Sequence, residues 1–315
     1  MNLKQNFQNQ IAESLFGANV SEERVCFLKR FAPKNHPDKR ESTHKEIAKL
    51  MKNDLAVYCE EKINQTIRKV IEVVHKAYGE EMKADGVNIE ALLNLKAGGT
   101  LKGKEDQESH KKFSPWKEAY KWLWNHKYLR WVDINGWEIL KKQAKTAPDW
   151  IQFLTEQEMA SVGVGTRALK PLSPRSYARK IDPTIPINQP LSMRVDLAYP
   201  NYQMLLFYRS AEMKYILCPS LGYAPNGVNQ PPMTLPQEGS VADDNKERFT
   251  FEELGKEEFL AIAVEKPFNL DWLIPREEEA LPEWNAERLK ELFEQLERDS
   301  NWQVFYQSFE VVETA

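Results

Sequence analysis

Apolar residues in the first half of the chain recur with the period of an α-helix. Between Asp54 and Tyr78 they are separated by three or four positions, which places them on one face of a helix. The residues of this face are Leu55, Cys59, Ile63, Ile67, Val70, Val74 and Ala77. The pattern predicts a long amphipathic helix that ends at Gly79.

Further helices are expected on either side of this one. Residues 1–30 are helical in pattern, and two prolines within residues 31–40 interrupt the pattern. Ser114-Pro115 has the capping residue and the first-turn proline of a helix start. Thr146-Ala-Pro148 has the same form and predicts a helix toward Met159.

The apolar pattern changes from helical to extended after residue 190. Four short runs rich in aliphatic, β-branched and aromatic residues predict strands at 191–197, 203–208, 214–218 and 259–264. A long loop is expected at 220–249. An acidic helix over 284–298 and a returning strand over 302–312 are expected to follow.

These elements predict an α+β protein with a helical N-terminal half and a β-sandwich-like C-terminal domain that carries a C-terminal helix. We assign residues 1–162 to a mostly helical, basic domain and residues 191–315 to the β-rich domain. Between them, residues 163–190 hold two glycines and five prolines, which is typical of an extended linker.

Composition indicates a globular chain rather than a disordered or membrane protein. Of 315 residues, 42% are hydrophobic and 29% are charged, and no apolar run reaches the ~18 residues of a bilayer span. The first ten residues are too polar for a signal peptide. The three cysteines are widely spaced, as expected of reduced thiols, so we expect a cytoplasmic protein.

Charge is distributed unevenly along the chain. Residues 1–150 carry 27 Lys and Arg against 21 Asp and Glu, whereas residues 251–315 carry 6 against 17. The basic half could bind an acidic partner, or the two halves could attract one another.

Two glycine motifs resemble nucleotide-binding loops but lack the required surroundings. Gly98 to Lys104 fits G-x-x-x-x-G-K, yet Glu105 follows where a Ser or Thr would hold magnesium, and no strand precedes the motif. Gly163 to Ala168 fits G-x-G-x-x-A but leads into Pro171 instead of a helix. We therefore expect no cofactor.

Cysteine and histidine positions do not predict a metal or catalytic site. The spacing of Cys26, His36 and His44 fits no usual zinc pattern. Cys218 with His126 as its base is the one conceivable nucleophile, but Cys218 ends an apolar strand, where a free thiol packs as a small hydrophobe. We therefore expect a protein that is not an enzyme.

Basic and aromatic residues of the N-terminal half are the candidate contacts for nucleic acid or for a protein partner. Lysines and arginines can neutralise phosphates, and tryptophans nearby can stack on bases, although tryptophans at helical spacing are more often core residues. The candidates are Lys29, Arg30, Lys34, Lys39, Arg40, Lys45, Lys117, Lys121, Lys127 and Arg130.

Five segments of the C-terminal domain carry a family resemblance. They are Tyr202–Phe207, Tyr215–Ser220, Leu235–Gly239, Leu254–Ile262 and Leu270–Leu273. In this order they resemble an uncharacterised β-domain that follows caspase-like peptidase or NACHT ATPase modules in bacterial, notably cyanobacterial, proteins. The family brings no catalytic residues. The resemblance implies an accessory role in signalling or defence.

The leading hypothesis is therefore a non-enzymatic adaptor of a bacterial signalling or defence system. Its partner would be an effector, peptidase or ATPase encoded elsewhere, and no membrane is involved. The alternative is a nucleic-acid-binding regulator that uses the basic N-terminal half. If a partner cleaves the chain, residues 98–112 and 163–190 are the expected sites.

Overall fold

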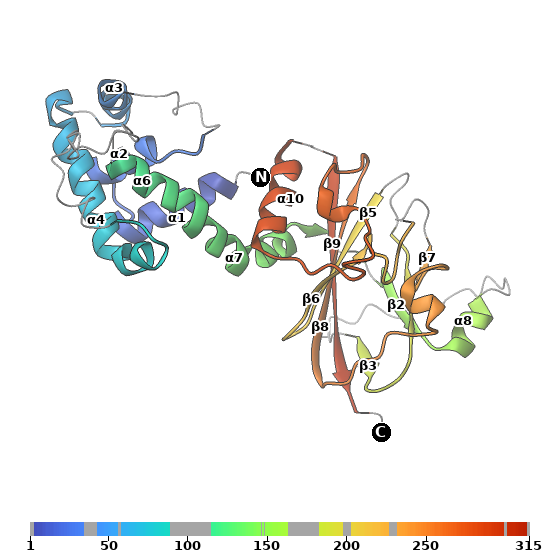
Figure 1. Cartoon of the computed structure of the whole chain (residues 1–315). Coiled ribbons are helices and arrows are strands. Elements are labelled where there is room, and N and C mark those ends of the chain that lie inside the picture. Colours follow the sequence, from blue (N-terminus) through green and yellow to red (C-terminus); the bar gives the residue numbers. More distant parts are fainter. Residues whose placement is uncertain are drawn as a thin grey trace, which may run out of the picture. The chain divides into compact units, whose positions relative to one another are not determined.

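A computed structural model describes the fold of this chain (Figure 1). It describes residues 3–34, 43–55, 58–88, 115–145, 147, 149–162, 183–197, 203–226, 232–298 and 301–313. The chain divides into two compact units, with unit 1 ending at Val132 and unit 2 beginning at Asp133. Among the described residues, no helix combines the length and the apolar character needed to cross a membrane.

Every described secondary-structure element of unit 1 is helical. Its elements are α1 (Leu3–Phe16), α2 (Glu22–Arg30), α3 (His44–Asp54), the 3-10 turn η1 (Glu60–Lys62), α4 (Ile63–Ala84), α6 (Pro115–Trp122), the π-helical turn η2 (Leu123–Lys127) and the start of α7 (Tyr128–Lys142). The helices bury an aromatic core. Phe7 of α1 packs against Tyr128 with their ring centroids 5.1 Å apart, and the indole N–H of Trp124 donates to the carbonyl of Phe31.

The helix boundaries of unit 1 differ in three places from those expected from the sequence. The described part of residues 1–30 forms two helices, α1 and α2, because Gly17 adopts a φ of +77° that ends α1. The expected helix from Asp54 begins only at Ile63. It then continues through Gly79 to Ala84, since Gly79 is tolerated within a helix that tertiary packing stabilises.

The larger sheet of unit 2 contains six strands among the described residues, in the order β1-β9-β8-β5-β6, with β3 also paired to β9. Its long central strands β8 (Gly255–Val264) and β9 (Trp302–Val312) are antiparallel and run side by side in Figure 1. The others are β1 (Ala144–Lys145), β3 (Thr184–Pro186), β5 (Gln203–Arg209) and β6 (Lys214–Cys218).

A smaller sheet covers one face of the larger one. It consists of β2 (Ile151–Leu154), β4 (Ser192–Val195) and β7 (Met233–Leu235) in antiparallel order. The core cluster of unit 2 contains side chains of both sheets, among them Met193 and Leu235 from the smaller and Leu206 and Phe259 from the larger. The expected sandwich-like arrangement of a mixed α+β chain is present.

The opposite face of the larger sheet contacts the end of α7 and the segment that leads to α10 (Ala286–Arg298). Trp137 of α7 stacks on Trp284 with ring centroids 5.2 Å apart and an interplanar angle of 8°. The indole N–H of Trp284 donates to the carbonyl of Tyr208 on β5. Helix α10 and strand β9 match the residues predicted for the C-terminal helix and strand closely.

Long-range pairing places the division of the chain earlier than residue 162. Ala144–Lys145 supply β1, and Ile151–Leu154, expected to lie in a helix from Thr146 toward Met159, instead supply β2. The helix α8 spans only Glu156–Val162. The expected loop at 220–249 also contains β7 and the short helix α9 (Val241–Asp244). Of the expected linker, residues 163–182 lie outside the described residues, as does the glycine motif that begins at Gly98.

Candidate functional site

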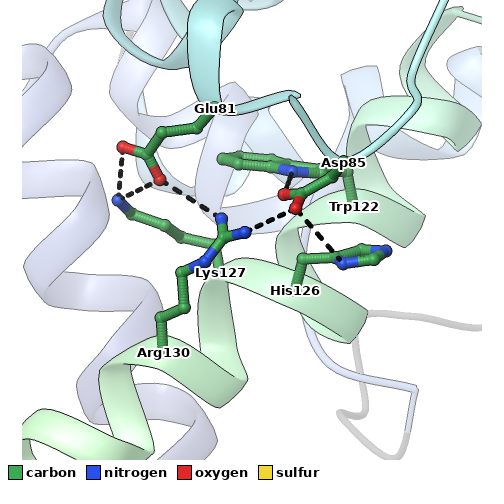
Figure 2. Close-up of polar contacts among 6 residues, drawn as sticks. All are labelled: Glu81, Asp85, Trp122, His126, Lys127 and Arg130. Atoms are coloured by element: carbon green, nitrogen blue, oxygen red, sulfur yellow. Dashed lines mark hydrogen bonds and ion pairs between the residues drawn. The ribbon is translucent and has the colours of Figure 1, made fainter. Parts of the chain in front are cut away.

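Six polar and aromatic side chains meet in unit 1 where α4 ends and α6, η2 and α7 pass it (Figure 2). We call this group the unit 1 clasp. Its members are Glu81, Asp85, Trp122, His126, Lys127 and Arg130. It contains two of the basic residues, Lys127 and Arg130, that the sequence marked as candidate contacts.

Local structure explains how these side chains come together. Glu81 lies in the last turn of α4 and Asp85, four residues later, is its C-cap residue, so both side chains lie on the same side of the helix end. On the facing segment, the π-helical turn η2 adds a residue to the helical path between α6 and α7. His126, Lys127 and Arg130 come from this turn and from the first turn of α7.

Asp85 is the most highly connected member of the clasp. Its Oδ1 accepts from the Arg130 guanidinium at 2.5 Å, and its Oδ2 accepts from the Trp122 indole N–H at 2.7 Å. The His126 Nδ1 lies 3.9 Å from Oδ1. The hydrogen bond from Arg130 is the main reason why the pKa of Asp85 is lowered from its ordinary range, and the same bond raises the pKa of Arg130.

Glu81 completes the clasp on the other side of Arg130. Both of its carboxylate oxygens lie 2.9 Å from the Lys127 ammonium, and Oε2 lies 3.5 Å from Arg130 Nη1. The Lys127 ammonium also lies 4.5 Å from the ring centroid of Tyr78, which packs on Trp122. The two carboxylates thus balance the two fixed positive charges.

The contacts of the clasp join helices. His126 and Asp85 are too far apart for a hydrogen bond, and none of the six clasp residues supplies a hydroxyl or thiol nucleophile. The contacts link the end of α4 to α6, η2 and α7 over a sequence separation of more than 35 residues. Lys127 and Arg130 are therefore held by carboxylates of the same unit.

The remaining candidate contacts fall into three groups. Lys29 pairs with Asp54 at 3.0 Å, Lys121 pairs with Glu118 at 2.7 Å, and the Arg30 guanidinium lies 3.4 Å from the ring centroid of Trp116. Burial lowers the pKa of Arg30 to about 10. Three lysines are exposed: Lys34, Lys45 and Lys117. Lys39 and Arg40 lie outside the described residues.

The tryptophans of residues 116–124 are mainly core residues. Trp122 is buried, and Trp124 is buried with its N–H bonded to a backbone carbonyl. Only Trp116 is half-buried, and Arg30 covers one of its faces. The structure therefore brings together part of the basic set but presents no row of open aromatic faces among the described residues.

The two cysteines considered as ligand or nucleophile, Cys26 and Cys218, are buried. Cys218 is fully buried and its thiol donates to the Met204 carbonyl, and burial raises its pKa to about 12. Burial likewise raises the pKa of Cys26 to about 12, although Arg30 opposes the change. In the part of the chain that the structure describes, no three His, Cys, Asp or Glu side chains are grouped to hold a metal ion.

Sequence reasoning missed a second ionic group, which lies on the larger sheet of unit 2. Glu258 of β8 accepts from Lys141 of α7 at 2.8 Å and from the Tyr306 hydroxyl of β9 at 2.5 Å. Burial raises the pKa of Glu258, but the hydrogen bonds from Lys141 and Tyr306 outweigh burial and the net pKa is lowered. One signal for this group is present in the sequence: the two consecutive glutamates Glu257 and Glu258 directly precede the apolar run of β8.

Comparison of the chain with protein-family models, with the sequences of curated proteins and with solved structures found no match.

Proposed function

We propose that the protein is a non-enzymatic adaptor that acts in the cytoplasm, in a bacterial signalling or defence system, by binding an effector, peptidase or ATPase encoded elsewhere. The β-domain resemblance of residues 191–312 supports the type of system. Contacts in the two units support the binding of a polypeptide over the binding of nucleic acid.

The observation that carries the proposal is a pair of exposed apolar side chains in unit 2. Met213 is 43% exposed and Leu254 is 56% exposed. They come from separate segments, yet both line one surface cavity. Apolar side chains that gather at a hollow, rather than being scattered singly, are typical of sites that bind other proteins.

The arrangement of charge in unit 1 supports the same proposal. To bind phosphates, lysine and arginine side chains must first give up the carboxylates with which they are paired. Lys29, Lys121, Lys127 and Arg130 each have a carboxylate of the same unit within 4 Å, and Arg30 is buried against Trp116. The internal pairing lowers the positive potential available to a nucleic acid.

The test is an affinity pull-down of the tagged full-length protein from its native cells, with and without nuclease. The double variant Met213→Ser/Leu254→Ser removes the apolar pair, and Val20→Ser/Ile134→Ser removes two exposed apolar side chains elsewhere as a matched control. We expect to recover a discrete partner protein whose amount is unchanged by nuclease and by the control variant. Recovery of this partner should fall about tenfold or more with Met213→Ser/Leu254→Ser.

Two outcomes contradict the proposal. One is equal recovery of the partner with both double variants. The other is recovery of nucleic acid with loss of every partner on digestion, which supports the regulator alternative and predicts a linear fall of log affinity with log salt.

A further inference from the structure

A small cavity opens at the end of the larger sheet of unit 2. Its walls are the turn Ser210–Met213, which joins β5 to β6, and the segment Thr250–Gly255, which leads into β8. Its volume is about 210 Å³. Sites for drug-sized molecules are larger, at roughly 300–1,000 Å³, so the size suits one side chain or a small ion.

The residues that line the cavity include a buried glutamate with an unpartnered carboxyl oxygen. Glu257 is 7% exposed, and its Oε2 atom is buried without a hydrogen-bond partner. Tyr208, which is 8% exposed, lines the same cavity. Buried polar atoms in folded proteins are almost always bonded, so an unpartnered carboxyl oxygen of a residue that lines a cavity suits a hydrogen-bond donor of a ligand.

Strand register places these two side chains on the same face of the sheet. Tyr208 is paired with Phe259, and Glu257 precedes Phe259 by two residues. Side chains alternate between the faces of a strand, so Glu257 and Tyr208 both point to the face that carries the core cluster. Burial raises the pKa of Tyr208, and the neighbouring Glu257 raises it further.

The charges around the cavity favour a cation. Four glutamates line it against a single lysine: Glu212, Glu252, Glu253 and Glu257 against Lys256. No group of three carboxylate, histidine or cysteine side chains able to hold a metal ion occurs among the described residues. An organic cation with its own hydrogen-bond donors fits this set of acceptors better than a bare metal ion.

Two apolar side chains lie at the rim of the cavity, and its walls are held in place. Met213 and Leu254 stand exposed at the rim. The Ser210 hydroxyl accepts from the backbone N–H of Met213, which fixes the turn. Opposite, Phe251 is anchored by packing on Phe153, with ring centroids 5.3 Å apart. The site is therefore preformed, which reduces the cost of binding.

We propose that this cavity binds the side chain of a lysine presented by a partner polypeptide. Met213 and Leu254 match the aliphatic stem of lysine, and the lining offers two acceptor groups, the Glu257 carboxyl and the Tyr208 hydroxyl, to the three donors of an ammonium group. A guanidinium prefers both oxygens of one carboxylate in a fork. This inference rests on the proposed function, since it names the chemistry of the partner's contact.

The test uses NMR of the full-length protein labelled at its methionine methyl groups. The chain has eight methionines, and Met213→Leu assigns the resonance at the rim. The probe is Nα-acetyl-lysine N-methylamide at constant ionic strength. We expect a saturable shift of the Met213 methyl resonance that the Nε-acetylated probe does not cause.

Variants separate the buried carboxylate from general acidity. Glu257→Gln is expected to weaken binding of the lysine probe about tenfold or more, because a charge-assisted hydrogen bond is lost. Glu238→Gln removes an exposed carboxylate that does not line the cavity, and it should leave the affinity unchanged.

Four results overturn the inference: no shift of Met213, an equal shift with the acetylated probe, equal binding of the corresponding arginine probe, or unchanged binding by Glu257→Gln. If the lysine probe fails while the pull-down yields a partner that depends on Met213 and Leu254, the inference fails and the proposed function stands. Probe binding without any polypeptide partner supports a lysine site and contradicts the adaptor function.

Discussion

Glu257 and Glu258 are consecutive residues of strand β8, and their carboxyl groups have pKa values shifted in opposite directions. Their side chains point to opposite faces of the larger sheet. Glu258 meets Lys141 and Tyr306, whose hydrogen bonds outweigh burial and lower its pKa. Burial raises the pKa of Glu257, the Tyr208 hydroxyl opposes this change, and Glu253 adds to it.

The opposite shifts give the two residues different roles in the fold. Glu258 joins α7 to the sheet through an ion pair that is mostly shielded from water. Glu257 keeps a carboxyl group in a buried position with one oxygen unsatisfied, which lowers stability. A buried carboxyl group that lowers stability is typical of a functional site, and this fits a binding role for the cavity.

Glu257→Gln should stabilise the protein at neutral pH by roughly 1 kcal/mol, because a neutral amide avoids the desolvation that raises the pKa of Glu257. The raised pKa means that the favourable contribution of Glu257 is complete below the ordinary value of 4.5 and is lost as pH rises through the folded-state pKa. The gain from Glu257→Gln should therefore disappear at low pH. Urea unfolding at several pH values measures it, and Glu238→Gln serves as the control. A variant less stable than the parent at neutral pH would contradict this account.

Glu258→Gln should destabilise unit 2 by roughly 2–3 kcal/mol, since it leaves the ammonium of Lys141 without its ionic partner in a largely buried place. The lowered pKa of Glu258 means that its stabilisation is present above the ordinary value of 4.5 and is lost as pH falls through the folded-state pKa. Asp133→Asn, which breaks the exposed pair with Lys214, should cost less than about 0.5 kcal/mol. Urea unfolding measures the free energy of unfolding of both variants. Equal decreases would show that the Glu258 contacts stabilise the protein no more than an exposed ion pair does.

Asp85→Asn should loosen the clasp of unit 1 and lower stability by about 1–2 kcal/mol, a range reduced because Arg130 is partly exposed. The lowered pKa of Asp85 means that its contribution is present above the ordinary value of 3.8 and is lost as pH falls below it. Glu72→Gln, which breaks an exposed pair with Arg68 on one helix, is the control. Hydrogen exchange of the backbone amides of α4 and α7 should increase in Asp85→Asn alone, and exchange unchanged from the parent would disprove the role of the clasp.

Only one of the three thiols should react quickly in the native protein. Cys59 is exposed, whereas Cys26 and Cys218 are buried and burial raises the pKa of each to about 12. An aromatic disulfide reagent should modify one thiol per native chain and three after denaturation. Cys59→Ser should abolish the fast phase. If a fast phase persists in Cys59→Ser, then Cys26 or Cys218 is accessible to the reagent, which contradicts the burial of both thiols.

Local patterns in the sequence were sufficient for much of the fold. The helical first half, strands β5 and β6, and the final helix and strand follow from apolar periodicity, because each depends on neighbours within a few residues. The mixed α+β class is confirmed for the same reason. The sequence did not predict that α1 ends at Gly17, because this depends on the backbone angle of one residue. It also did not predict that α4 continues through Gly79, because this depends on what the helix packs against.

Tertiary structure alone decided which distant segments pair and which charges meet. Strands β2 and β7 are short and have no strong pattern, and they are strands because β4 bonds to both. The lysines and arginines form one basic set in the sequence, but in the structure several of them pair with acidic side chains. Lys127 pairs with Glu81, and Arg130 pairs with Asp85. The contrast between Glu257 and Glu258 likewise arises from what each face of β8 meets. Burial and ion pairing depend on contacts between residues far apart in the chain, and no local pattern contains that information.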